Sequence, residues 1–439
     1  MPPCDSTLSP SAEACLISSE FAIFVDPAGK DNGVGTKGSP VNTIAKAIEL
    51  AGDQKLVIAC NGTYDEQLNI LGRARIYGGF ACLSSADPWT YEEGTRATVA
   101  PTTRGLALNI ASGEAEVDIE DFEFDAQDGT DAGESSIAGF VKESTNVAFH
   151  RVKLMAGKGV NGVDGTLTSV TFPTQADLNG KNASGDNGGD PNPQTCTAGG
   201  ATRGGRGGDG GGSVSSGTGG LPDLGAGKGG TQGLDCAAGG TGASGTDAPA
   251  QLPALGASKL GTITPTGWNG AIGADGTPGA PGQGGGGGAG AAAGGGGGGG
   301  GAGGCGGSGG TGGKAGGSSI ALLVLNSTLT LDASELSSAN AGNGGKGIGG
   351  QVGQLDSGKG GIQVPDGCAG GKGGKGGSGG AGGGAAGGIS VGIAYQGTAP
   401  MPDAATAITV GTSGTKGLGG VPGTNDGIDG QAQNILEVL

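Results

Sequence analysis

Acidic side chains gather in one stretch of the chain, where they could take part in hydrolysis or hold a cation. From Glu114 to Glu134 the sequence contains ten carboxylates and no basic residue. Three of them, Asp118, Glu123 and Asp125, flank a predicted corner between short strands and could project outward as a stripe. Carboxylate oxygens are the ligands that Ca²⁺ prefers, so this stripe is a candidate calcium site. We favour a solvated acidic surface instead and expect no other cofactor.

The same carboxylates, with Arg104 or Arg151 as the positive group, could form the site of a polysaccharide lyase or glycoside hydrolase. Such a site needs a cleft and usually aromatic side chains against which sugar rings stack. The chain has only two Trp and four Tyr, and most of them lie away from this stripe. The single histidine, His150, stands at a predicted corner, where a hydrogen-bonded or solvated role is favoured over a catalytic one. We therefore predict that the protein is not an enzyme.

The eight cysteines are the remaining residues with chemistry of their own. They occur as sequence neighbours: Cys4 and Cys15, Cys60 and Cys82, Cys196 and Cys236, Cys305 and Cys368. The even count, the lack of a CxxC spacing and the single histidine argue against zinc and for disulfides, which form in an oxidising compartment. Pairing between neighbours is the simplest of the many connectivities that eight cysteines allow, and it is our starting hypothesis.

Hydrophobic residues gather in short islands with the pattern of paired strands. In EVDIEDFEFD (116–125) two apolar residues alternate, two acids interrupt, and two phenylalanines alternate in the opposite parity. Two strands joined by a two-residue corner would direct both apolar faces inward. The unit recurs in NVAFHRVKL (146–154) and LTLDASEL (329–336), and fades in ITVGTS (408–413). Its predicted inward residues include Phe122, Phe149, Val152, Leu331 and Leu336.

Later copies of this unit follow a lead strand. SSIAGFVKEST (135–145) matches SSIALLVLNST (318–328) at seven of eleven positions, and ISVGIAY (389–395) stands in the corresponding place before the last copy. Recurrence of one strand–corner–strand unit predicts an all-β fold, a parallel β-helix whose coils stack and bury apolar ladders. In SPVNTIAKAIELAG (39–52), apolar residues at helical spacing between Pro40 and Gly52 predict a helix that caps the open end.

Two family resemblances follow from these motifs. IFVDPAGKDNGVGTKGSPVNTIAKAIELA and LVIACNGTYDEQLNI, within residues 21–156, resemble the capping segment of pectin-lyase-like right-handed β-helix proteins. That resemblance implies a right-handed β-helix and no particular activity. The alternation of coils with glycine tracts resembles the glycine-rich, PGRS-type exported proteins of myxobacteria, which implies a surface location and no established activity.

Glycine-rich tracts lie between the islands, at about 157–317, 342–388 and 411–430. GGKGGKGGSGGAGGG (370–384) has glycine in at least two positions of every triplet. Three is the number of residues per turn of a polyproline II helix, and two bare faces would let neighbouring helices approach and form hydrogen bonds. We therefore predict a polyglycine II bundle. The alternatives are a disordered linker and a collagen helix, which would need more proline.

These assignments divide the chain into five parts. They are the cap and first coils (1–156), a glycine-rich insert (157–317), a coil (318–341), a second insert (342–388), and a terminal coil with a tail (389–439).

The charge of the chain restricts its partners and its location. The net charge is −17, with 23 acidic against 11 basic residues in positions 1–156. Such a surface repels nucleic acid and anionic membranes, and no apolar run is long enough to span a membrane. No signal peptide is visible, and we interpret the start of the sequence as one from which an export signal was removed. We expect an extracellular or cell-surface location.

These expectations favour a non-enzymatic secreted or cell-surface scaffold, structural or adhesive, that displays a disulfide-pinned glycine-rich bundle. Its partners would be a polysaccharide, matrix or other envelope proteins, or further copies of itself. The alternative is a β-helix protein that binds or cleaves carbohydrate, which would need a groove along the solenoid. A third hypothesis is an ice- or mineral-binding surface, although the sequence lacks the Thr or Ala ladders that would favour it.

Overall fold

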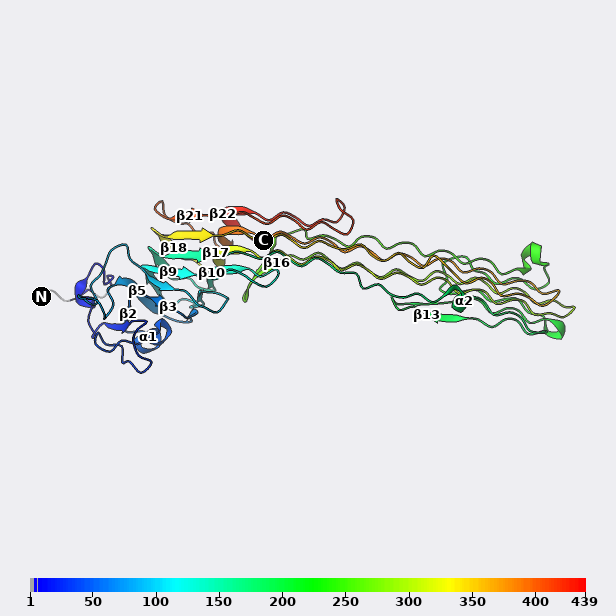
Figure 1. Cartoon of the computed structure of the whole chain (residues 1–439), viewed down its shortest axis with the longest axis horizontal. Coiled ribbons are helices and arrows are strands. Elements are labelled where there is room, and N and C mark those ends of the chain that lie inside the picture. The colour runs from blue at the N-terminus through cyan, green and yellow to red at the C-terminus, as the bar shows by residue number, and fades with distance from the viewer. Residues whose placement is uncertain (1–3, 6) are drawn as a thin grey trace.

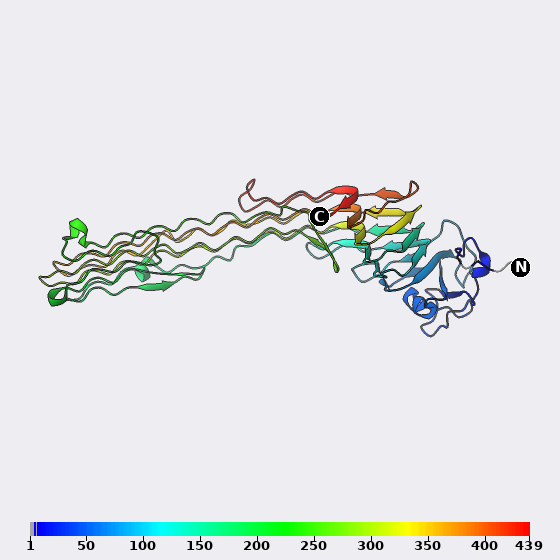
Figure 2. The same ribbon diagram turned by 180° about the vertical axis from the view of Figure 1, so that it is seen from behind.

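The computed structural model describes residues 4, 5 and 7–439, which form a parallel β-helix from which a long arm extends (Figure 1). Three sheets of six strands each run along the β-helix. The described N-terminal residues lie at the end of the β-helix away from the arm, as both side views show (Figures 1 and 2). The predicted all-β fold with stacked parallel sheets is thereby confirmed.

The three sheets are named here by their strands. Sheet I contains β1 (Ala22–Val25), β2 (Leu56–Cys60), β5 (Ala74–Phe80), β8 (Val117–Glu120), β11 (Val147–His150) and β18 (Leu329–Asp332). Sheet II contains β3 (Thr63–Tyr64), β6 (Ala97–Val99), β9 (Phe122–Asp125), β12 (Lys153–Ala156), β19 (Glu335–Ser338) and β21 (Ala407–Thr409). Sheet III contains β4 (Leu68–Ile70), β7 (Leu108–Ile110), β10 (Ser136–Lys142), β17 (Ser319–Leu325), β20 (Ser390–Gln396) and β22 (Ala432–Glu437).

Few other regular elements occur in the described part of the chain. Two antiparallel hairpins are β13 (Pro193–Thr195) with β14 (Ala201–Arg203), and β15 (Gly261–Thr264) with β16 (Gly267–Gly270). The helical segments are η1 (Ala14–Leu16), α1 (Ile44–Ala51), α2 (Gln175–Leu178), η2 (Gly211–Ser213) and η3 (Cys236–Gly240). None of these helices is long and apolar enough to cross a membrane.

Equivalent residues of successive coils stack in register along the sheets. Ser136 of β10 pairs with Ser319 of β17, which pairs with Ser390 of β20, as the repeat of the lead strand predicts. Phe149 pairs with Ile119 of the coil before it. The five predicted inward residues are all at most 2% exposed: Phe122, Phe149, Val152, Leu331 and Leu336.

The corner between sheets I and II consists of one residue in the left-handed region. Asp121, Arg151 and Ala333 occupy it with φ values of 56°, 54° and 47°. The predicted two-residue corner is therefore wrong, because Glu120 and His150 still belong to strands β8 and β11. A single left-handed residue already reverses the parity of the side chains, at a cost of roughly 1–2 kcal/mol for a residue other than glycine.

A second corner, between sheets III and I, repeats in the same way. Glu143, Asn326 and Gly397 have positive φ at equivalent positions of three coils, and the Asn326 amide donates to the Glu143 carboxylate (2.9 Å). Just behind this corner, the backbone N–H of Ser144 donates to the buried hydroxyl of Ser327 (3.0 Å). Buried serines thus satisfy backbone groups where the chain leaves the sheet.

Helix α1 caps the N-terminal end of the β-helix, as the spacing of its apolar residues predicts. The helix begins at Ile44, after Pro40, because the Thr43 hydroxyl accepts the N–H of Lys46 (3.3 Å) and caps the first turn. The Glu66 carboxylate accepts the N–H of Ile44 (2.6 Å) and so joins the helix to the first coil. Burial raises the pKa of Glu66, although the backbone N–H groups of Ile44 and Ala45, which donate to this carboxylate, lower it.

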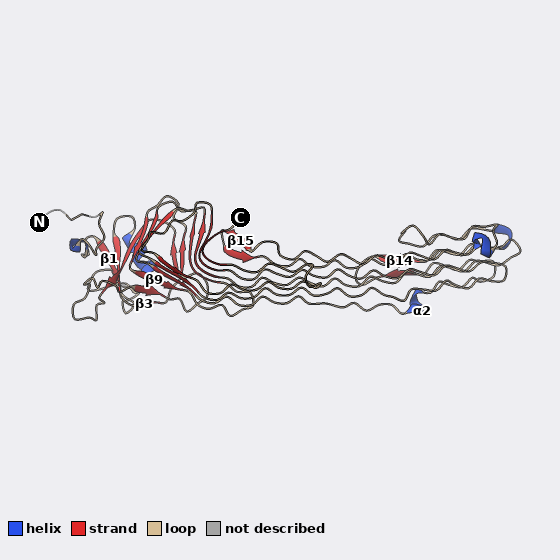
Figure 3. Ribbon diagram, turned by 90° about the horizontal axis from the view of Figure 1, so that it is seen from above, coloured by secondary structure: helices blue, strands red, loops and turns tan. Residues whose placement is uncertain are grey.

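The long inserts all leave the β-helix at one corner. Each connects a strand of sheet II with the next strand of sheet III: β12 with β17, β19 with β20, and β21 with β22. Because the connected strands stack, the inserts start and end at adjacent places. They run side by side as extended tracts and form the arm, which is seen from above in Figure 3.

Backbone hydrogen bonds between the arm's tracts recur at every third residue. One antiparallel pair of tracts is joined by donors Gly273, Gly276 and Gly279 to acceptors Gly313, Gly310 and Gly307. A parallel pair is joined by donors Gly301, Gly304 and Gly307 to acceptors Gly371, Gly374 and Gly377. The tracts therefore satisfy their backbone groups laterally, without an apolar core.

The close approach of the tracts requires glycine at particular positions. A Cβ atom on Gly373 would lie 2.2 Å from the carbonyl oxygen of Ala302, and one on Gly376 would lie 1.9 Å from that of Cys305. The side chains of Lys372 and Lys375, each directly before one of these glycines, are exposed. Position within the triplet thus decides whether a side chain can be accommodated.

A second apolar core, which the sequence did not indicate, lies on the outer face of sheet III. Hairpin β15–β16 folds back from the base of the arm and packs Ile263 and Trp268 against Ile137, Phe140 and Ile320. This contact joins the arm to the β-helix through side chains as well as through the chain itself.

Candidate functional site

The outer face of sheet I carries a row of titratable side chains that spans four coils. The Tyr77 hydroxyl donates to Asp118 Oδ2 (2.6 Å). His150 lies between two carboxylates, with Nε2 at 3.8 Å from Asp118 Oδ1 and Nδ1 at 3.2 Å from Asp332 Oδ2. The residues come from strands β5, β8, β11 and β18, which are neighbours in the sheet. We call this row the sheet I ladder.

The corner next to the ladder is a network around Arg151. Its guanidinium pairs with Glu120 and Asp121, with Nε at 2.8 Å from Asp121 Oδ1. The hydrogen bond with Asp121 raises the pKa of Arg151. The Tyr91 hydroxyl donates to the other oxygen of Asp121 (2.9 Å), and burial, followed by this hydrogen bond, raises the pKa of Tyr91 to about 12. The Ser11 hydroxyl donates to Glu120 (2.6 Å).

The ladder brings together two predicted site residues, Asp118 and His150, and adds Tyr77 and Asp332. A histidine flanked by carboxylates can accept or donate a proton, as general acid–base catalysis requires. However, the ladder lies on a strand surface, and none of the cavities described below is lined by these four side chains. Most of its polar groups bind one another. The arrangement therefore suits contacts that stabilise the stacking of neighbouring coils better than an enclosed reaction site.

The three candidate calcium ligands do not converge. Asp118 lies in sheet I, whereas Glu123 and Asp125 lie on β9 in sheet II. Glu123 pairs with Lys153 (3.4 Å). Burial, and secondarily Glu123, raises the pKa of Asp125. The structure thus places the acidic run on different faces of the β-helix.

The groups of metal-binding residue types that do converge within the described residues contain paired cysteines. They are Cys4, Glu13 and Cys15, and Asp26, Cys60 and Cys82. The sulfurs of both groups are joined in disulfides. A disulfide sulfur is not the thiolate that a metal needs, so neither group is a metal centre.

Arg104, the other candidate positive group, has a different position and role. It lies in the loop before β7 and pairs with Asp131 (3.1 Å) and Glu134 (2.8 Å). Backbone N–H groups of Asp131 and Thr130, and secondarily Arg104, lower the pKa of Glu134. Arg104 therefore stabilises the turn before β10 and takes no part in the sheet I ladder.

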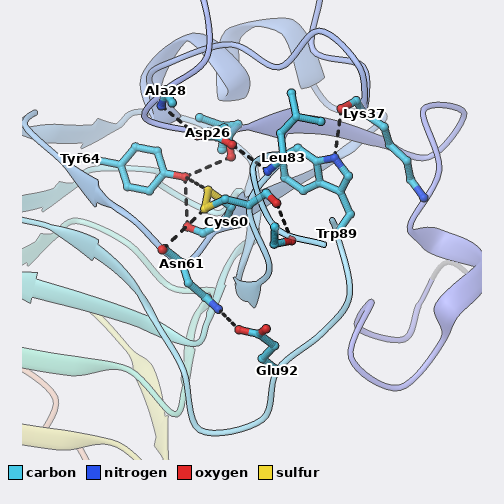
Figure 4. Close-up of a disulfide and its surroundings, with 12 residues drawn as sticks. Asp26, Ala28, Lys37, Cys60, Asn61, Tyr64, Leu83, Trp89 and Glu92 are labelled. Carbon is cyan, nitrogen blue, oxygen red and sulfur yellow. Dashed lines mark hydrogen bonds between the residues drawn. A yellow bond between two sulfur atoms is a disulfide. The ribbon is translucent and has the colours of Figure 1, made fainter. Parts of the chain in front are cut away.

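The disulfide Cys60–Cys82 forms part of the N-terminal cap (Figure 4). Beside it, the buried Asp26 accepts the N–H groups of Ala28 (2.8 Å) and Leu83 (3.0 Å). The Tyr64 hydroxyl donates to the backbone carbonyl of Val25 (3.0 Å), and burial raises the pKa of Tyr64 strongly. All of these polar groups are occupied by internal hydrogen bonds, so we assign this region a structural role.

The arm contains the other two disulfides, and here the predicted neighbour pairing is wrong. The bonds are Cys196–Cys305 and Cys236–Cys368, whereas Cys4–Cys15 and Cys60–Cys82 pair as predicted. The tracts explain the difference, because the chain passes back and forth along the arm between neighbouring cysteines. The hydroxyl of Thr202 accepts the N–H of Gly303 (2.8 Å), which places the segment after Cys196 beside Cys305. The N–H of Gly242 donates to Ala369 (3.0 Å), which does the same for Cys236 and Cys368.

The role of Asp332 could have been found from the sequence. Its position in LTLDASEL is equivalent to that of His150 in NVAFHRVKL, and the two residues pair in register. The repeated coils place these two polar side chains at the same position of the unit, and the sequence therefore indicates that they stack. Tyr77 had no such signal, because its coil lacks the repeated pattern.

Comparisons with known proteins cover only the N-terminal part of the chain. Residues 27–72, which include the capping helix, match the model of DUF1565, described as a protein of unknown function and associated with right-handed β-helix proteins. No curated protein and no solved structure matches the chain. The match agrees with the β-helix and the position of its cap, and it carries no activity.

Proposed function

We propose that this chain is a non-enzymatic, secreted or cell-surface scaffold that presents its arm for structural or adhesive contacts. The observation that carries the proposal is the common exit of the three inserts. Because they leave from stacked coils, the β-helix aligns the tracts and limits the entropy lost when they become ordered. The β-helix then serves as a base and the arm as the part that reaches a partner.

We assign the arm to the polyglycine II type. The assignment is supported by the three-residue period of hydrogen bonds between tracts, since a polyproline II helix has three residues per turn. Outward positions also contribute, because Asn161 and Asn343 accept backbone N–H groups of the neighbouring tracts. Such a bundle is held together by backbone hydrogen bonds although most of its residues carry no side chain. A stiff, extended structure of this kind suits a spacer.

The disulfides support an oxidising, extracellular location. The structure has four of them and no free cysteine among the described residues. Two lie in the arm and close loops whose cysteines are 109 and 132 residues apart in sequence. Crosslinks over such long loops restrict the unfolded chain most, in the chain-entropy model, and would be reduced in the cytosol.

The distal tip of the arm is the surface we assign to the contact. Four turns, at 211–214, 232–239, 291–295 and 364–367, meet there and line a cavity of about 540 Å³. Its side chains include Val214, Leu234, Asp235 and Asp366, and Leu234 is 47% exposed. The tip therefore combines apolar and acidic groups, in contrast to the glycine-rich shaft.

The experiment compares binding to a glycan array and to isolated envelope material for the wild type and for Leu234→Ser. Leu252→Ser is the control, because Leu252 is an even more accessible leucine, 84% exposed, and lies on the shaft. We expect binding to fall at least tenfold in Leu234→Ser and to be unchanged in Leu252→Ser. Equal binding by all three proteins would show that the tip does not make the contact with the partner.

A carbohydrate-cleaving enzyme is the second candidate, and the sheet I ladder is the observation that favours it. A polysaccharide cleavage screen, run on the same glycans, separates the two functions. Release of new sugar ends by the wild type but not by His150→Ala would contradict the scaffold proposal. Binding without release of sugar ends would support the scaffold.

A further inference from the structure

A cavity of about 530 Å³ lies in the inner corner where the arm meets the β-helix. Its walls come from the loop before β7, the start of β10, hairpin β15–β16 and the arm tract 314–316. Small-molecule cavities commonly measure roughly 300–1,000 Å³, so this one has the volume of a ligand site. We call it the junction cavity. It lies at the base of the arm and is separate from the tip discussed above.

Apolar side chains dominate the walls of the junction cavity. Leu106, Ile137 and Trp268 belong to the second apolar core on the outside of sheet III and also face this space. Ile272 lies on the arm side and is 55% exposed. A ligand with an apolar body would cover these side chains. Ile272 is the most exposed of them, so its burial would contribute the most apolar area.

One charged side chain, Lys314, lines the junction cavity. Within the described residues, its ammonium group has no ion pair or hydrogen bond. Asp131 and Glu134 flank the wall formed by residues 132–133, but both carboxylates pair with Arg104 (3.1 and 2.8 Å). The other residues that line the junction cavity are uncharged, so no group within it balances the ammonium charge. The unbalanced charge favours an anionic ligand.

An unpaired hydrogen-bond donor lies in the same wall. Trp268 is only 9% exposed, and its Nε1–H has no acceptor among the described atoms. A Cβ on Gly270 would lie 3.8 Å from this nitrogen and 2.6 Å from the methyl group of Ala315. Glycine at 270 therefore allows the hairpin to pack closely against Ala315 beside the indole. Burying an N–H without an acceptor is unfavourable, and this nitrogen is closed off from solvent by the packing around it.

We propose that the junction cavity binds a small amphipathic carboxylate, with an apolar body and one anionic head. The apolar body packs on Leu106, Ile137 and Ile272, while the carboxylate pairs with the Lys314 ammonium group. This inference does not depend on the role proposed for the tip of the arm.

Octanoate is the probe for this site, and Trp268 provides the signal because the chain has only one other tryptophan. Titration followed by tryptophan fluorescence and by calorimetry should give one saturable site. Octanol, which keeps the apolar body, and acetate, which keeps the head, should each bind at least tenfold more weakly than octanoate.

Lys314→Gln should weaken octanoate at least tenfold and leave octanol unchanged. Lys346→Gln is the matched control, because Lys346 is an exposed arm lysine whose ammonium group has no partner among the described residues either. Both substitutions lie on the surface, so folding is retained. Ile272→Ser should weaken octanoate and octanol alike.

Three results would overturn the proposal. The first is the absence of binding heat and fluorescence change up to about 10 mM octanoate, the upper end of weak binding. The second is equal affinity for octanol and octanoate, which would remove the role of the charge. The third is an equal loss in Lys314→Gln and Lys346→Gln, which would indicate attraction by the surface charge alone.

Discussion

Replacing Phe149 by alanine should destabilise the β-helix by about 3–5 kcal/mol. Its ring is fully buried inside the β-helix. It lies in an apolar row between Ile119 and Leu331, which belong to the coils on either side. The estimate contains two parts, the transfer of the ring out of an apolar environment and the cavity that remains. The cavity persists because backbone hydrogen bonds to both neighbouring coils hold the surrounding strands in place. The loss therefore belongs at the upper end for a core substitution.

Urea unfolding of the chain in a Trp268→Phe background measures this loss, because Trp89 then remains as the one tryptophan. Trp89 is buried against Phe24 of strand β1, at the N-terminal end of the β-helix. Thr330→Ala is the control. Thr330 is exposed on the outer face of the next coil, and its loss should change the free energy of unfolding by no more than about 0.5 kcal/mol. An unfolding midpoint for Phe149→Ala equal to that of Thr330→Ala would refute the stacked ladder at this coil.

Three further predictions concern titration, disulfides and calcium. The neutral phenol of Tyr91 is favoured in the fold, since its pKa is raised to about 12; this contribution to stability is complete below about pH 10 and is lost as the pH rises through 12. In absorbance titrations, the phenol transition that is present in the wild type and lost in Tyr91→Phe should lie near pH 12, whereas a lost transition near pH 10 would contradict the burial of Tyr91. Non-reducing peptide mapping should recover a linked pair containing Cys196 and Cys305, and recovery of Cys196 with its sequence neighbour would disprove the arrangement of the arm. Calcium should not bind with submicromolar affinity, because Asp118 and Glu123 lie on different sheets; tight binding in a calorimetric titration would show that the acidic run converges elsewhere.

The β-helix could be predicted because the same alternation of apolar and polar residues recurs in its coils, and most apolar residues of these copies are buried. The alternation around Phe149 and Leu331 encodes which side chains face inward, and the repeat of the lead strand encodes their register. The corner was harder to predict. Asp121, Arg151 and Ala333 share a left-handed conformation but share no residue type that favours it, so sequence alone suggested a longer turn.

The arm could be predicted only in its local conformation. Triplets of glycine indicate that neighbours approach closely, but a bare backbone does not specify which tract lies beside which. That choice depends on where each tract leaves the β-helix and how far it runs before it turns. The predicted pairing of Cys196 with Cys236 is wrong for this reason. Hairpin β15–β16 was missed as well, because its contacts with sheet III join residues more than fifty positions apart.

Amide hydrogen exchange across residues 368–388 tests the ordered glycine bundle most directly. In the wild type, the N–H groups of this tract that donate to neighbouring tracts should be protected from exchange. Gly373→Val and Gly376→Val should abolish that protection, because their Cβ atoms would lie within 2.2 Å of backbone oxygens. Lys372→Ala and Lys375→Ala should retain it. Fast exchange throughout the wild type, or equal protection in the glycine and lysine variants, would contradict the bundle.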